Sequence, residues 1–483
     1  MFETNKNAFR KTKILNSIGP ATESAEMMEK MIKAGSSAFR FNFSHETVTH
    51  LDRLKTLREV SKKLGVYVTA VADIQGPKHR VGVFKDDKAK LEIGQKFTVD
   101  LDETPGDSTR VCLPHPEVIE ALEVGSRILV DDGKVQLKVT KKGADFAETE
   151  VLSGEWIKNK KGFNIPDVRI KSSCLTKKDR EDIEIINSAD FDYLAFSFVQ
   201  TAEDCRECRE LVRDDIKIIA KMEKPQAMEN LVEITKEVDA LMVARGDLAV
   251  EVGAENVPLC QKEMIRVGRD LAKPVIVATH MMESMIDNPF PTRAEVTDVA
   301  NAVFEGADCV MTSAETTIGD YPIETVEMMD SVIRKVEASE DYKRNLNAVI
   351  LEGLEHNTVS DVMAHSAKQI SNELSASAIV TATVSGTTAI RIAKNKPEAP
   401  ILAVSLEPRT LGRLGICAGV RGVVTSEENN SELGMDNFAR ELAKKEVNAE
   451  TGDHIVVSMG KKTPEAKSVM EEGNTNIVTV VRV

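Results

Sequence analysis

The fold of this sequence is decided by two short apolar runs that each end abruptly in charged residues. Residues 218–223 read Ile-Ile-Ala-Lys-Met-Glu, and residues 241–247 read Leu-Met-Val-Ala-Arg-Gly-Asp. A short apolar run of this kind is typical of a buried strand in a parallel sheet. Charged side chains at the carboxyl end of such a strand are costly to desolvate unless they pair with a ligand, a metal ion or each other. The two runs therefore indicate strands that carry functional groups at their ends.

Outward from these two runs, similar apolar segments alternate with amphipathic stretches of helical length. The predicted strands cover residues 12–18, 38–43, 67–74, 192–198, 216–222, 240–244, 274–279 and 308–312. Eight parallel strands with helices between them close a (β/α)8 TIM barrel. The alternative, a doubly wound open sheet, normally carries a glycine-rich phosphate-binding turn after its first strand, and this sequence lacks one there. We therefore predict an α/β fold built on a barrel.

Two regions outside the barrel pattern differ from it in character. Between residues 75 and 167 the hydrophobic pattern alternates in period two, with turn signals such as Asp132-Gly133. This pattern predicts a small β-barrel domain, inserted as a lid over the strand ends. From about residue 358, strands alternate with helices again, which predicts an open α/β sheet. The expected domains are 1–74 and 168–345 for the barrel, 75–167 for the lid and 346–483 for the C-terminal domain.

The predicted strands of the C-terminal domain are short apolar runs like those of the barrel. They cover residues 378–382, 401–404, 422–425, 454–458 and 477–481. This domain is expected to have a regulatory role.

The composition excludes several classes of function. The chain of 483 residues carries a formal charge of −15, and aromatic residues make up 4% of it, which together disfavour nucleic-acid binding. No apolar run approaches the roughly 18 residues that a membrane-spanning helix requires. Residues 1–6 lack the apolar core of a signal peptide. We therefore expect a cytoplasmic protein without nucleic-acid or membrane partners.

One pair of cysteines has the spacing of a metal or redox site. Cys205 and Cys208 lie in a charged helical stretch, and no second pair follows them. Free cysteines one helical turn apart are therefore favoured over a zinc or redox site.

The predicted barrel brings the carboxyl ends of its strands to one mouth, where several polar side chains meet. Glu223 and Asp247, from neighbouring strands, suit a hard divalent cation such as Mg²⁺. Lys221 and Arg40 supply positive charge beside them, which is the combination that phosphoryl transfer requires. The alternative is a buried network of ion pairs that joins Lys221 to Glu223 and Arg40 to Asp73.

At these residues the sequence resembles the pyruvate kinase family. The matching segments are residues 12–14, 18–20, 40–45, 73–78, 128–134, 161–166, 219–223, 242–248, 273–285, 291–303 and 313–322. The resemblance covers residues 10–345 closely and the remainder more loosely. It implies a barrel with a β-rich lid inserted after the third strand, an α/β C-terminal domain and a homotetramer. The implied reaction converts phosphoenolpyruvate and ADP into pyruvate and ATP, as the last step of glycolysis.

The resemblance implies roles for the charged residues at the barrel mouth. Glu223 and Asp247 correspond to the Mg²⁺ ligands, a position that Mn²⁺ could also fill. Lys221 matches the catalytic lysine that stabilises charge on the transferring phosphoryl group. Arg40 matches the arginine that holds this group before transfer. Lys221, Arg40 and Asp247 would therefore also contact the substrate.

Further roles follow for the remaining substrate and nucleotide contacts. The backbone of Gly246 and the hydroxyl of Thr279 match the site of the substrate carboxylate. Thr279 also matches a catalytic residue that helps to protonate the enolate through water. The implied nucleotide contacts are Asn42, His45, Arg80 and Lys161.

A monovalent cation site is implied near Asn42, Ser44, Asp73 and the carbonyl of Ile74. In the family members that need K⁺, a glutamate stands at the position of Lys78. A lysine carries a compact monovalent charge of its own, so its ammonium could replace the ion and repel a second cation. The resemblance therefore implies an enzyme that does not require K⁺. The alternative is that Lys78 points into solvent.

An effector site is implied by the turn between a strand and a helix at residues 383–388. Backbone N–H groups at a helix N-terminus can bind phosphate, although Ser and Thr are also ordinary N-caps. The loop at residues 461–466 departs from the family's glycine-rich pattern, which weakens the inference that fructose 1,6-bisphosphate is the effector. The candidate effector residues are Thr383, Ser385, Gly386, Thr387 and Thr388.

The sequence also departs from the family pattern at His79, His280 and Asn16-Ser17. The two histidines are expected to tune the kinetics, whereas Asn16-Ser17 has no interpretation from sequence. Two other functions stay open. One is a Mg²⁺-dependent barrel lyase for oxaloacetate- or pyruvate-like substrates, which would not need Arg80 or Lys161. The other is a catalytically silent sensor of sugar phosphates.

Overall fold

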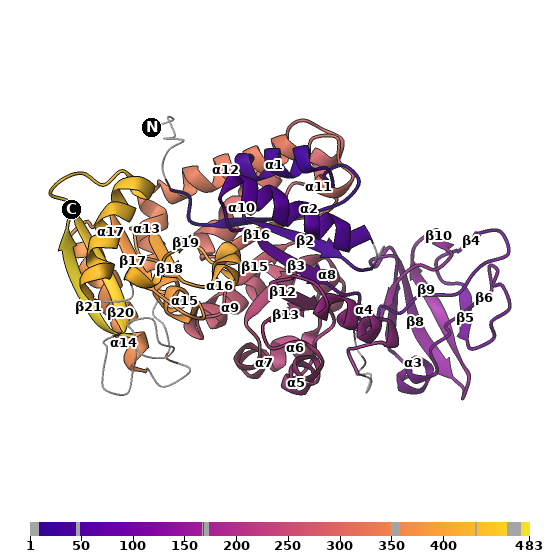
Figure 1. The fold of residues 1–483 in the computed structure, drawn as a ribbon. Coiled ribbons are helices and arrows are strands. Elements are labelled where there is room, and N and C mark those ends of the chain that lie inside the picture. The colour runs from indigo at the N-terminus through magenta and orange to yellow at the C-terminus, as the bar shows by residue number, and fades with distance from the viewer. Residues whose placement is uncertain are drawn as a thin grey trace.

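A computed structural model describes residues 9–44, 49–166, 168, 173–348, 353, 358–429, 432–460 and 475–483. In this part of the chain, eight parallel strands close a barrel in the order β1-β16-β15-β14-β13-β12-β3-β2 (Figure 1). Each lies within one of the predicted strands, and the predicted barrel is confirmed. The strands are β1 (Lys13–Ser17), β2 (Ala38–Asn42), β3 (Thr69–Asp73), β12 (Tyr193–Phe196), β13 (Lys217–Met222), β14 (Ala240–Ala244), β15 (Val275–Ala278) and β16 (Cys309–Thr312).

Alternation along each strand sorts the side chains between the barrel interior and the surrounding helices. On β13, Ile219 packs with other interior side chains, whereas Ile218 and Ala220 pack among the helices. The same alternation places Lys221 on the interior side, at the carboxyl end of the strand. On β2, the flanking Phe residues face the helices in the same way, which turns Arg40 toward the interior. Lys221 and Arg40 therefore face the barrel mouth because alternate side chains of a strand point to the same side of the sheet.

Helices surround the barrel and return the chain from one strand to the next. Several begin with a capping box, as at Thr176, Thr201 and Thr292, where a hydroxyl and an acidic side chain satisfy free N–H groups. The barrel helices are α1 (Ala25–Ala34), α2 (Thr49–Leu64), α4 (Lys177–Asn187), α5 (Ala202–Leu211), α6 (Pro225–Glu229), α7 (Leu231–Glu237), α8 (Arg245–Val252), α9 (Val257–Asp270), α10 (Arg293–Glu305), α11 (Ala314–Thr317), α12 (Pro322–Glu337) and α13 (Glu340–Ala348), with short turns η1 (Ala254–Asn256) and η2 (Glu283–Ile286).

The lid is inserted between β3 and α4 (Figure 1). It has a hydrophobic core of its own, which includes Phe97, Ile128 and Leu137. Its main sheet has the order β11-β7-β8-β9-β5-β6, and β10 pairs with β4. Within it β5 and β6 run parallel. The lid elements are β4 (Lys88–Lys90), β5 (Lys96–Asp100), β6 (Arg110–Cys112), α3 (Pro116–Ala121), β7 (Arg127–Val130), β8 (Val135–Lys142), β9 (Phe146–Ser153), β10 (Trp156–Lys158) and β11 (Phe163–Asn164).

The barrel wall is continuous across the lid insertion, because β3 pairs directly with β12 and Val71 lies opposite Tyr193. The lid is fastened to the barrel by side chains near its two crossings. At the second crossing, Asn164 Nδ2 donates a buried hydrogen bond to Glu251 Oε1 over 2.7 Å. Lys224 Nζ lies 2.5 Å from the same Glu251 oxygen.

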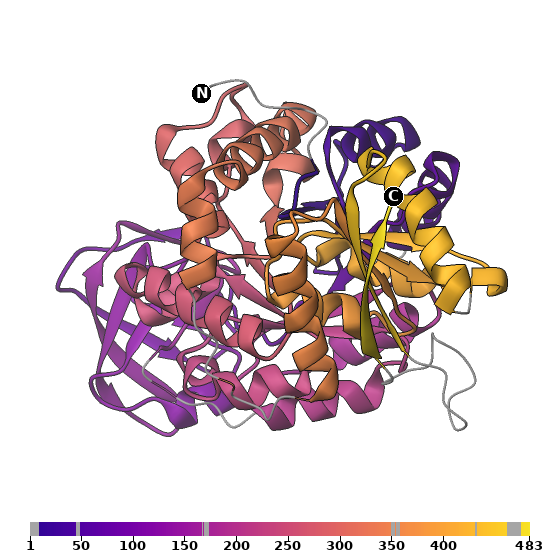
Figure 2. The ribbon, with the colours of Figure 1, turned by 90° about the vertical axis from the view of Figure 1, so that its left-hand side faces the viewer.

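The C-terminal domain is an open sheet in the order β19-β18-β17-β20-β21. Figure 1 shows this domain and the lid at opposite ends of the barrel, and in Figure 2 the C-terminal domain faces the viewer. The last strand, β21, runs antiparallel to β20, whereas the other strands are parallel. The elements are α14 (Val359–Glu373), β17 (Ala378–Ala382), α15 (Thr387–Lys394), β18 (Ile401–Ser405), α16 (Pro408–Arg413), η3 (Leu414–Ile416), β19 (Val420–Val424), η4 (Glu427–Asn429), α17 (Glu432–Val447), β20 (His454–Gly460) and β21 (Thr475–Arg482).

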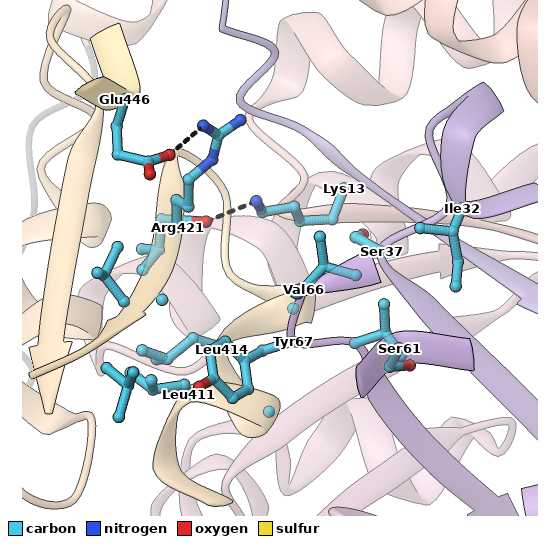
Figure 3. Close-up of a pocket in the computed structure, with 18 of the residues that line it drawn as sticks. Lys13, Ile32, Ser37, Ser61, Val66, Tyr67, Leu411, Leu414, Arg421 and Glu446 are labelled. Atoms are coloured by element: carbon cyan, nitrogen blue, oxygen red, sulfur yellow. Dashed lines mark hydrogen bonds and ion pairs between the residues drawn. The ribbon is translucent and has the colours of Figure 1, made fainter. Parts of the chain in front are cut away.

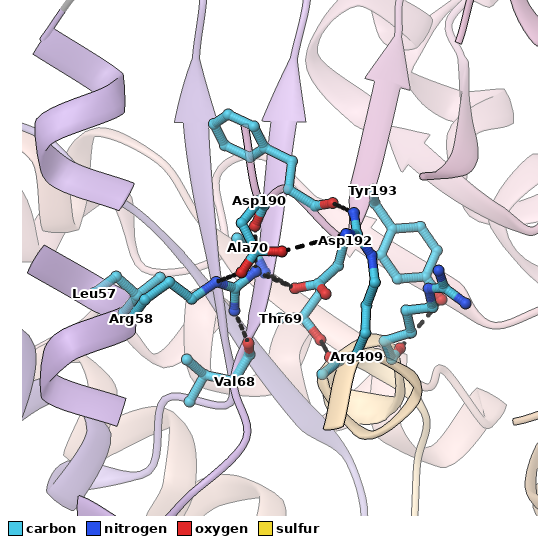
Figure 4. A network of polar contacts seen from close by, with 12 residues as sticks. Leu57, Arg58, Val68, Thr69, Ala70, Asp190, Asp192, Tyr193 and Arg409 are labelled. Atoms are coloured by element: carbon cyan, nitrogen blue, oxygen red, sulfur yellow. Dashed lines mark hydrogen bonds and ion pairs between the residues drawn. The ribbon is translucent and has the colours of Figure 1, made fainter. Parts of the chain in front are cut away.

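The C-terminal domain meets the barrel at the amino ends of the barrel strands, opposite the lid. A network of charged side chains joins the two parts there (Figure 4). Arg409 of α16 lies 3.5 Å from Asp190 and 2.8 Å from Asp215. From the barrel side, Arg58 of α2 pairs with Asp190 and Asp192. Carboxylates at the start of β12 and β13 are therefore shared between barrel and C-terminal domain.

Among the described helices, none is long and apolar enough to cross a membrane. Cys205 and Cys208 are buried on α5 among the apolar side chains that pack between barrel and helices. Burial raises the pKa of both thiols, which is typical of unreactive packing cysteines.

Candidate active site

Lys221 is the centre of the polar cluster at the barrel mouth. Its ammonium lies 3.3 Å from Asp73 Oδ1 of β3 and 3.1 Å from Glu223 Oε1, which follows β13. It also donates a hydrogen bond of 2.6 Å to Ser197 Oγ, beyond the end of β12. Three neighbouring strands of the barrel therefore converge on one amine.

Arg40 enters the same cluster from β2. Its Nε lies 2.5 Å from Asp73 Oδ2, and its Nη1 donates to Ser17 Oγ over 3.0 Å. Asp73, which is 1% exposed, thus joins Arg40 to Lys221. Both ion pairs of the alternative interpretation are present, and they consist of the same residues that the catalytic interpretation requires.

Burial and charge act differently on the three central groups. Burial disfavours the ammonium of Lys221, but the carboxylates of Asp73 and Glu223 outweigh this effect and raise its pKa. Burial also acts to raise the pKa of Asp73, yet Arg40 and Lys221 outweigh it and lower that pKa. For Glu223 burial dominates over the attraction of Lys221 and raises its pKa to about 7. Lys221 is therefore held in its charged form.

The carboxylates of Glu223 and Asp247 fit a hard divalent cation. Glu223 Oε2 accepts a hydrogen bond of 2.7 Å from the backbone N–H of Phe198. Its Oε1 is buried, receives no well-aligned hydrogen bond and has the Lys221 ammonium 3.1 Å away as its charged partner. This oxygen can therefore accept a metal ion, since carboxylate oxygens are the ligands that Mg²⁺ prefers. Asp247 follows β14, the strand that pairs with β13, and its charge also acts to raise the pKa of Glu223.

Backbone strain marks the end of β15. Thr279 and His280 have φ angles of 76° and 56°, in the left-handed region that residues with a Cβ atom rarely adopt. Gly246 packs against this turn, where an added Cβ atom would lie 3.0 Å from Thr279 Cγ2. Such strain persists only where the surroundings hold it, and it gathers at functional sites.

Arg245 supplies that support, and sequence reasoning did not single it out. Its guanidinium donates to the carbonyls of Ala278 and Thr279 over 3.1 and 2.6 Å. Asp298 of α10 holds the guanidinium from the other side over 2.7 Å. The position of Arg245 beside Gly246 was visible in the sequence, but its carbonyl partners lie more than thirty residues away.

The predicted nucleotide contacts lie in two separate places. Asn42 is at the end of β2, where its Oδ1 accepts a hydrogen bond from the N–H of Ser44 over 3.2 Å. Arg80 and Lys161 lie on the lid, where Arg80 pairs with Gly162 in an isolated bridge. Lys161 Nζ lies 2.9 Å from Asp131 Oδ1. The fourth predicted contact, His45, lies outside the described residues.

Lys78 points toward the barrel mouth. Its Nζ lies 3.2 Å from Asp247 Oδ1, and the side chain is 33% exposed. Of the predicted monovalent-site groups, Asp73 is engaged by Arg40 and Lys221, and the Ile74 carbonyl accepts from Ser197 Oγ over 3.0 Å. The structure thus places the Lys78 ammonium on a candidate metal ligand.

In the turn at residues 383–388, some hydroxyl groups are buried and others face the solvent. Gly386, at φ 92°, precedes α15, and its N–H donates to Thr383 Oγ1 over 3.0 Å. Thr388 Oγ1 is buried and 2.7 Å from Thr475 Oγ1. Ser385 Oγ lies 2.9 Å from Thr387 Oγ1, and Thr387 is exposed. Residues 461–466 lie outside the described residues.

The structure gives Asn16-Ser17 a role that the sequence could not. Ser17 Oγ donates to the Thr312 carbonyl over 2.9 Å and accepts from Arg40. Asn16 is fixed by Ser36 and Thr312 at 2.8 and 3.1 Å. Ser17 therefore helps to orient Arg40 at the mouth, whereas Asn16 ties β1 to Thr312 and Ser36.

A wide cleft lies at the other end of the barrel, between its floor and the C-terminal domain (Figure 3). It has a volume of about 1680 Å³, and Lys13, Leu414 and Arg421 are among its lining residues. Lys13 Nζ donates to the Val420 carbonyl over 2.6 Å across this cleft. The cleft is separate from the polar cluster, which lies at the carboxyl ends of the strands, where barrel enzymes carry their active sites.

Fold and site together define a class of enzyme: a parallel barrel whose mouth combines a buried lysine, an arginine and carboxylates beneath an inserted lid. Comparison with protein families narrows this class. The model described as the pyruvate kinase barrel domain matches residues 9–326, and the one described as the pyruvate kinase alpha/beta domain matches residues 361–481. The chain belongs to the pyruvate kinase family.

Individual relatives agree with the family match. The chain is 43% identical over 452 residues to a pyruvate kinase of Methylorubrum extorquens, covering 93% of this chain and 94% of the relative. It is 40% identical over 453 residues to one of Agrobacterium vitis, covering 93% and 95%. A crystal structure of a pyruvate kinase from Cryptosporidium parvum matches with a TM-score of 0.91 at 32% identity, covering 98% of this chain and 96% of that one.

Proposed function

We propose that this chain is a pyruvate kinase, which transfers the phosphoryl group of phosphoenolpyruvate to ADP and produces pyruvate and ATP. The observation that carries the proposal is the charged Lys221 at the barrel mouth, between Asp73 and Glu223 and near Arg40. Family membership and the names of the relatives support it. In the transfer the bond from phosphorus to the enol oxygen breaks, and a bond to the terminal oxygen of ADP forms.

Glu223 and Asp247 would hold Mg²⁺, or Mn²⁺ in its place. When bound, the metal ion would neutralise charge on the phosphoryl group and on the substrate carboxylate. Lys221 then acts on the charge that develops during transfer, since its carboxylate neighbours keep it protonated. Arg40, oriented by Ser17, binds the phosphoryl group before transfer.

Gly246 and Thr279 would bind the carboxylate of the substrate and steer the second half of the reaction. The enolate left after transfer must gain a proton at its methylene carbon to become pyruvate. The hydroxyl of Thr279, whose backbone is held by Arg245, assists this protonation through water. Asn42, His45, Arg80 and Lys161 would contact the nucleotide, the last two from the lid.

Lys78 makes K⁺ unnecessary in this proposal. Its ammonium lies at the mouth, 3.2 Å from Asp247, and supplies a monovalent charge there. Asn42, Ser44, Asp73 and Ile74 would then act as structural groups. A divalent ion held by Asp247 would take the place of this contact with Lys78.

The remaining parts of the proposal concern regulation, oligomeric state and cellular location. A phosphorylated effector would bind the turn formed by Thr383, Ser385, Gly386, Thr387 and Thr388. The enzyme would act in the cytoplasm as a homotetramer, at the last step of glycolysis.

A coupled assay with lactate dehydrogenase tests the central proposal. Phosphoenolpyruvate, ADP and Mg²⁺ should together yield pyruvate, and omission of any one should abolish it. A chelator of divalent ions should stop the reaction, and added Mg²⁺ should restore it. Pyruvate formation without ADP, or from oxaloacetate alone, would favour the lyase instead. A silent sensor would give no turnover under any of these conditions.

A further inference from the structure

Two histidines and a glutamate meet beside the first crossing from barrel to lid. His79 precedes Arg80 on the crossing segment, His115 is the residue before α3, and Glu117 lies in the first turn of α3. The Nδ1 atoms of the two imidazoles are 3.3 Å apart. His115 Nδ1 lies 3.6 Å from Glu117 Oε1. One possible ligand atom from each of the three residues lies within 4.8 Å of the other two.

Two of these separations, 3.3 and 3.6 Å, match the edges of a tetrahedral metal site, and the ligand atoms of all three residues lie within 4.8 Å of one another. Zn²⁺ binds imidazole nitrogen and carboxylate oxygen at about 2.0–2.2 Å, which places ligand atoms roughly 3.3–3.6 Å apart around a tetrahedron. Two nitrogens and one carboxylate oxygen, with a fourth position left for water, are a ligand set that such borderline cations accept. Only a small adjustment of Glu117, whose side chain is 43% exposed, would be needed to complete the site.

The surroundings hold His79 in place as a neutral ring. Its plane stacks on Phe163, with ring centres 5.7 Å apart and 25° between the planes. The N–H of Phe163 donates to the His79 carbonyl over 3.1 Å, which fixes the backbone. Burial lowers the pKa of His79 to about 4. A neutral imidazole is the form that binds metal ions.

Water can reach this ring from the barrel side. A cavity of about 30 Å³ borders His79 and is also lined by Lys224. This volume accommodates a single water molecule. The positive charge of Lys224, which also acts to lower the pKa of His79, is partly balanced by Glu251, 2.5 Å away.

We propose that His79, His115 and Glu117 bind one transition-metal ion of the Zn²⁺ class at the base of the lid. In the metal-free form, His115 Nε2 accepts a hydrogen bond from the N–H of Arg80 over 3.4 Å. The proton of His115 therefore lies on Nδ1, between the two rings. Metal binding at Nδ1 moves this proton to Nε2 and costs the long hydrogen bond from Arg80. The ion thus clamps the crossing segment to α3 and releases the backbone of a predicted nucleotide contact.

Metal binding is measured directly on the full chain after dialysis against a chelator. The Asp247→Asn variant in saturating Mg²⁺ serves as the parent protein. This choice suppresses Zn²⁺ binding at the candidate divalent site of the barrel mouth, so that binding at the lid is measured alone. Zn²⁺ is titrated by calorimetry, and Co²⁺ is used as a spectroscopic probe. We expect one Zn²⁺ per chain and the intense visible absorption of four-coordinate Co²⁺. An outer-shell partner alone is worth about 10–100-fold in affinity, so His79→Leu should weaken Zn²⁺ binding by at least about 100-fold.

Two further variants keep the test decisive. Glu117→Gln changes an exposed side chain, leaves the packing of the lid intact, and should weaken binding even if His79→Leu fails to fold. His365→Gln removes an exposed imidazole from α14 and should leave the affinity unchanged. The proposal is overturned if Zn²⁺ does not bind, or if Glu117→Gln and His365→Gln bind it as tightly as the parent. It is also overturned if the Co²⁺ spectrum is that of a six-coordinate ion.

Discussion

At the scale of single residues, Lys221 is a largely buried cation at the barrel mouth that lies between two carboxylates. Its charge is supported by Asp73 and Glu223 from two strands and by a hydrogen bond to Ser197. An ammonium held in this way needs no reorganisation when charge develops on a transferring phosphoryl group. The same contacts would be made in a purely structural ion-pair network, so kinetic measurements must separate the two roles.

Replacement of Lys221 by methionine should lower kcat far more than it raises KM for phosphoenolpyruvate. The charge acts mainly in the transition state, and loss of one such group typically costs on the order of 10² to 10³ in rate. Proton exchange at the methyl group of pyruvate, which needs no phosphoryl transfer, should be better preserved. Lys217→Met, at the other end of β13, is the matched control. A Lys221→Met variant with near-normal kcat would disprove the assignment.

The second residue-scale prediction concerns Lys78 and K⁺. Wild-type rates should be the same in tetramethylammonium buffer with and without KCl, because the Lys78 ammonium supplies the monovalent charge. Lys78→Glu should restore a cation site and make the rate depend on K⁺. The structure supports a role near the mouth, since Lys78 contacts Asp247. A tenfold or larger increase when K⁺ is added to the wild type would contradict the prediction.

The third concerns Lys13, which is buried on the barrel floor. Burial, with the nearby Arg10 charge, lowers its pKa to about 8 from 10.5. Between these values the unfolded chain binds a proton that the native chain has lost, so the contribution of Lys13 to stability rises with pH. From pH 8 to 10.5 the wild type should gain up to about 3 kcal/mol relative to Lys13→Met.

Unfolding midpoints in denaturant at pH 7.5 and 10.5 measure this change. Lys30→Met, which removes an exposed lysine, should give the same difference from the wild type at both pH values. Parallel pH profiles of the wild type and Lys13→Met would mean that Lys13 does not titrate in this range.

At the scale of elements, α16 connects the predicted effector turn with the barrel floor. Thr410 Oγ1 of α16 donates to the Val384 carbonyl over 2.6 Å. At the end of the same helix, the Arg413 carbonyl accepts from Tyr193 Oη of β12 over 3.1 Å. β12 leads to Ser197, which holds Lys221. A chain of direct contacts therefore extends from the turn to the candidate catalytic lysine.

Activation by a phosphorylated effector should be lost in Ser385→Glu. The added carboxylate lies where the phosphate of the effector is expected and repels it. Ser385→Ala should retain activation, because the backbone N–H groups would supply most of the contacts. The measurement is phosphoenolpyruvate saturation with and without sugar monophosphates, fructose 1,6-bisphosphate and AMP. If none of these compounds changes the saturation curve of the wild type, the effector site is wrong.

At the scale of elements, the strands could be predicted from the sequence where burial imposes a hydrophobic pattern. Each barrel strand is a short apolar run, and a parallel barrel brings the carboxyl ends of all its strands to one mouth. The grouping of the site residues could therefore be predicted without knowing any individual contact. The parallel pairing of β5 with β6 and the antiparallel β21 could not be predicted, because edge pairings leave a weak pattern. The Lys78–Asp247 ion pair joins residues 169 positions apart, so no local signal revealed it.

At the scale of the whole molecule, a buried hydrogen bond from Asn164 to Glu251 fastens the lid to the barrel. Asn164→Ala should loosen this attachment and raise KM for ADP by a factor of about five, since one hydrogen bond is worth about 1 kcal/mol. Asn159→Ala is the control, because Asn159 bonds within the lid, to Asp87 and Phe84. An unchanged KM for ADP in Asn164→Ala would show that this bond does not position the lid.

The continuous wall between β3 and β12 has a consequence for how the protein is made. Ala70 N–H donates to the Asp192 carboxylate although the two residues are 122 positions apart. During synthesis the ribosome must therefore release the whole lid before the first half of the barrel can find its partner strand. The lid, whose core is built from its own residues, can fold before the barrel closes. Until β12 is synthesised and pairs with it, β3 is an open sheet edge, the kind of surface on which nascent chains aggregate.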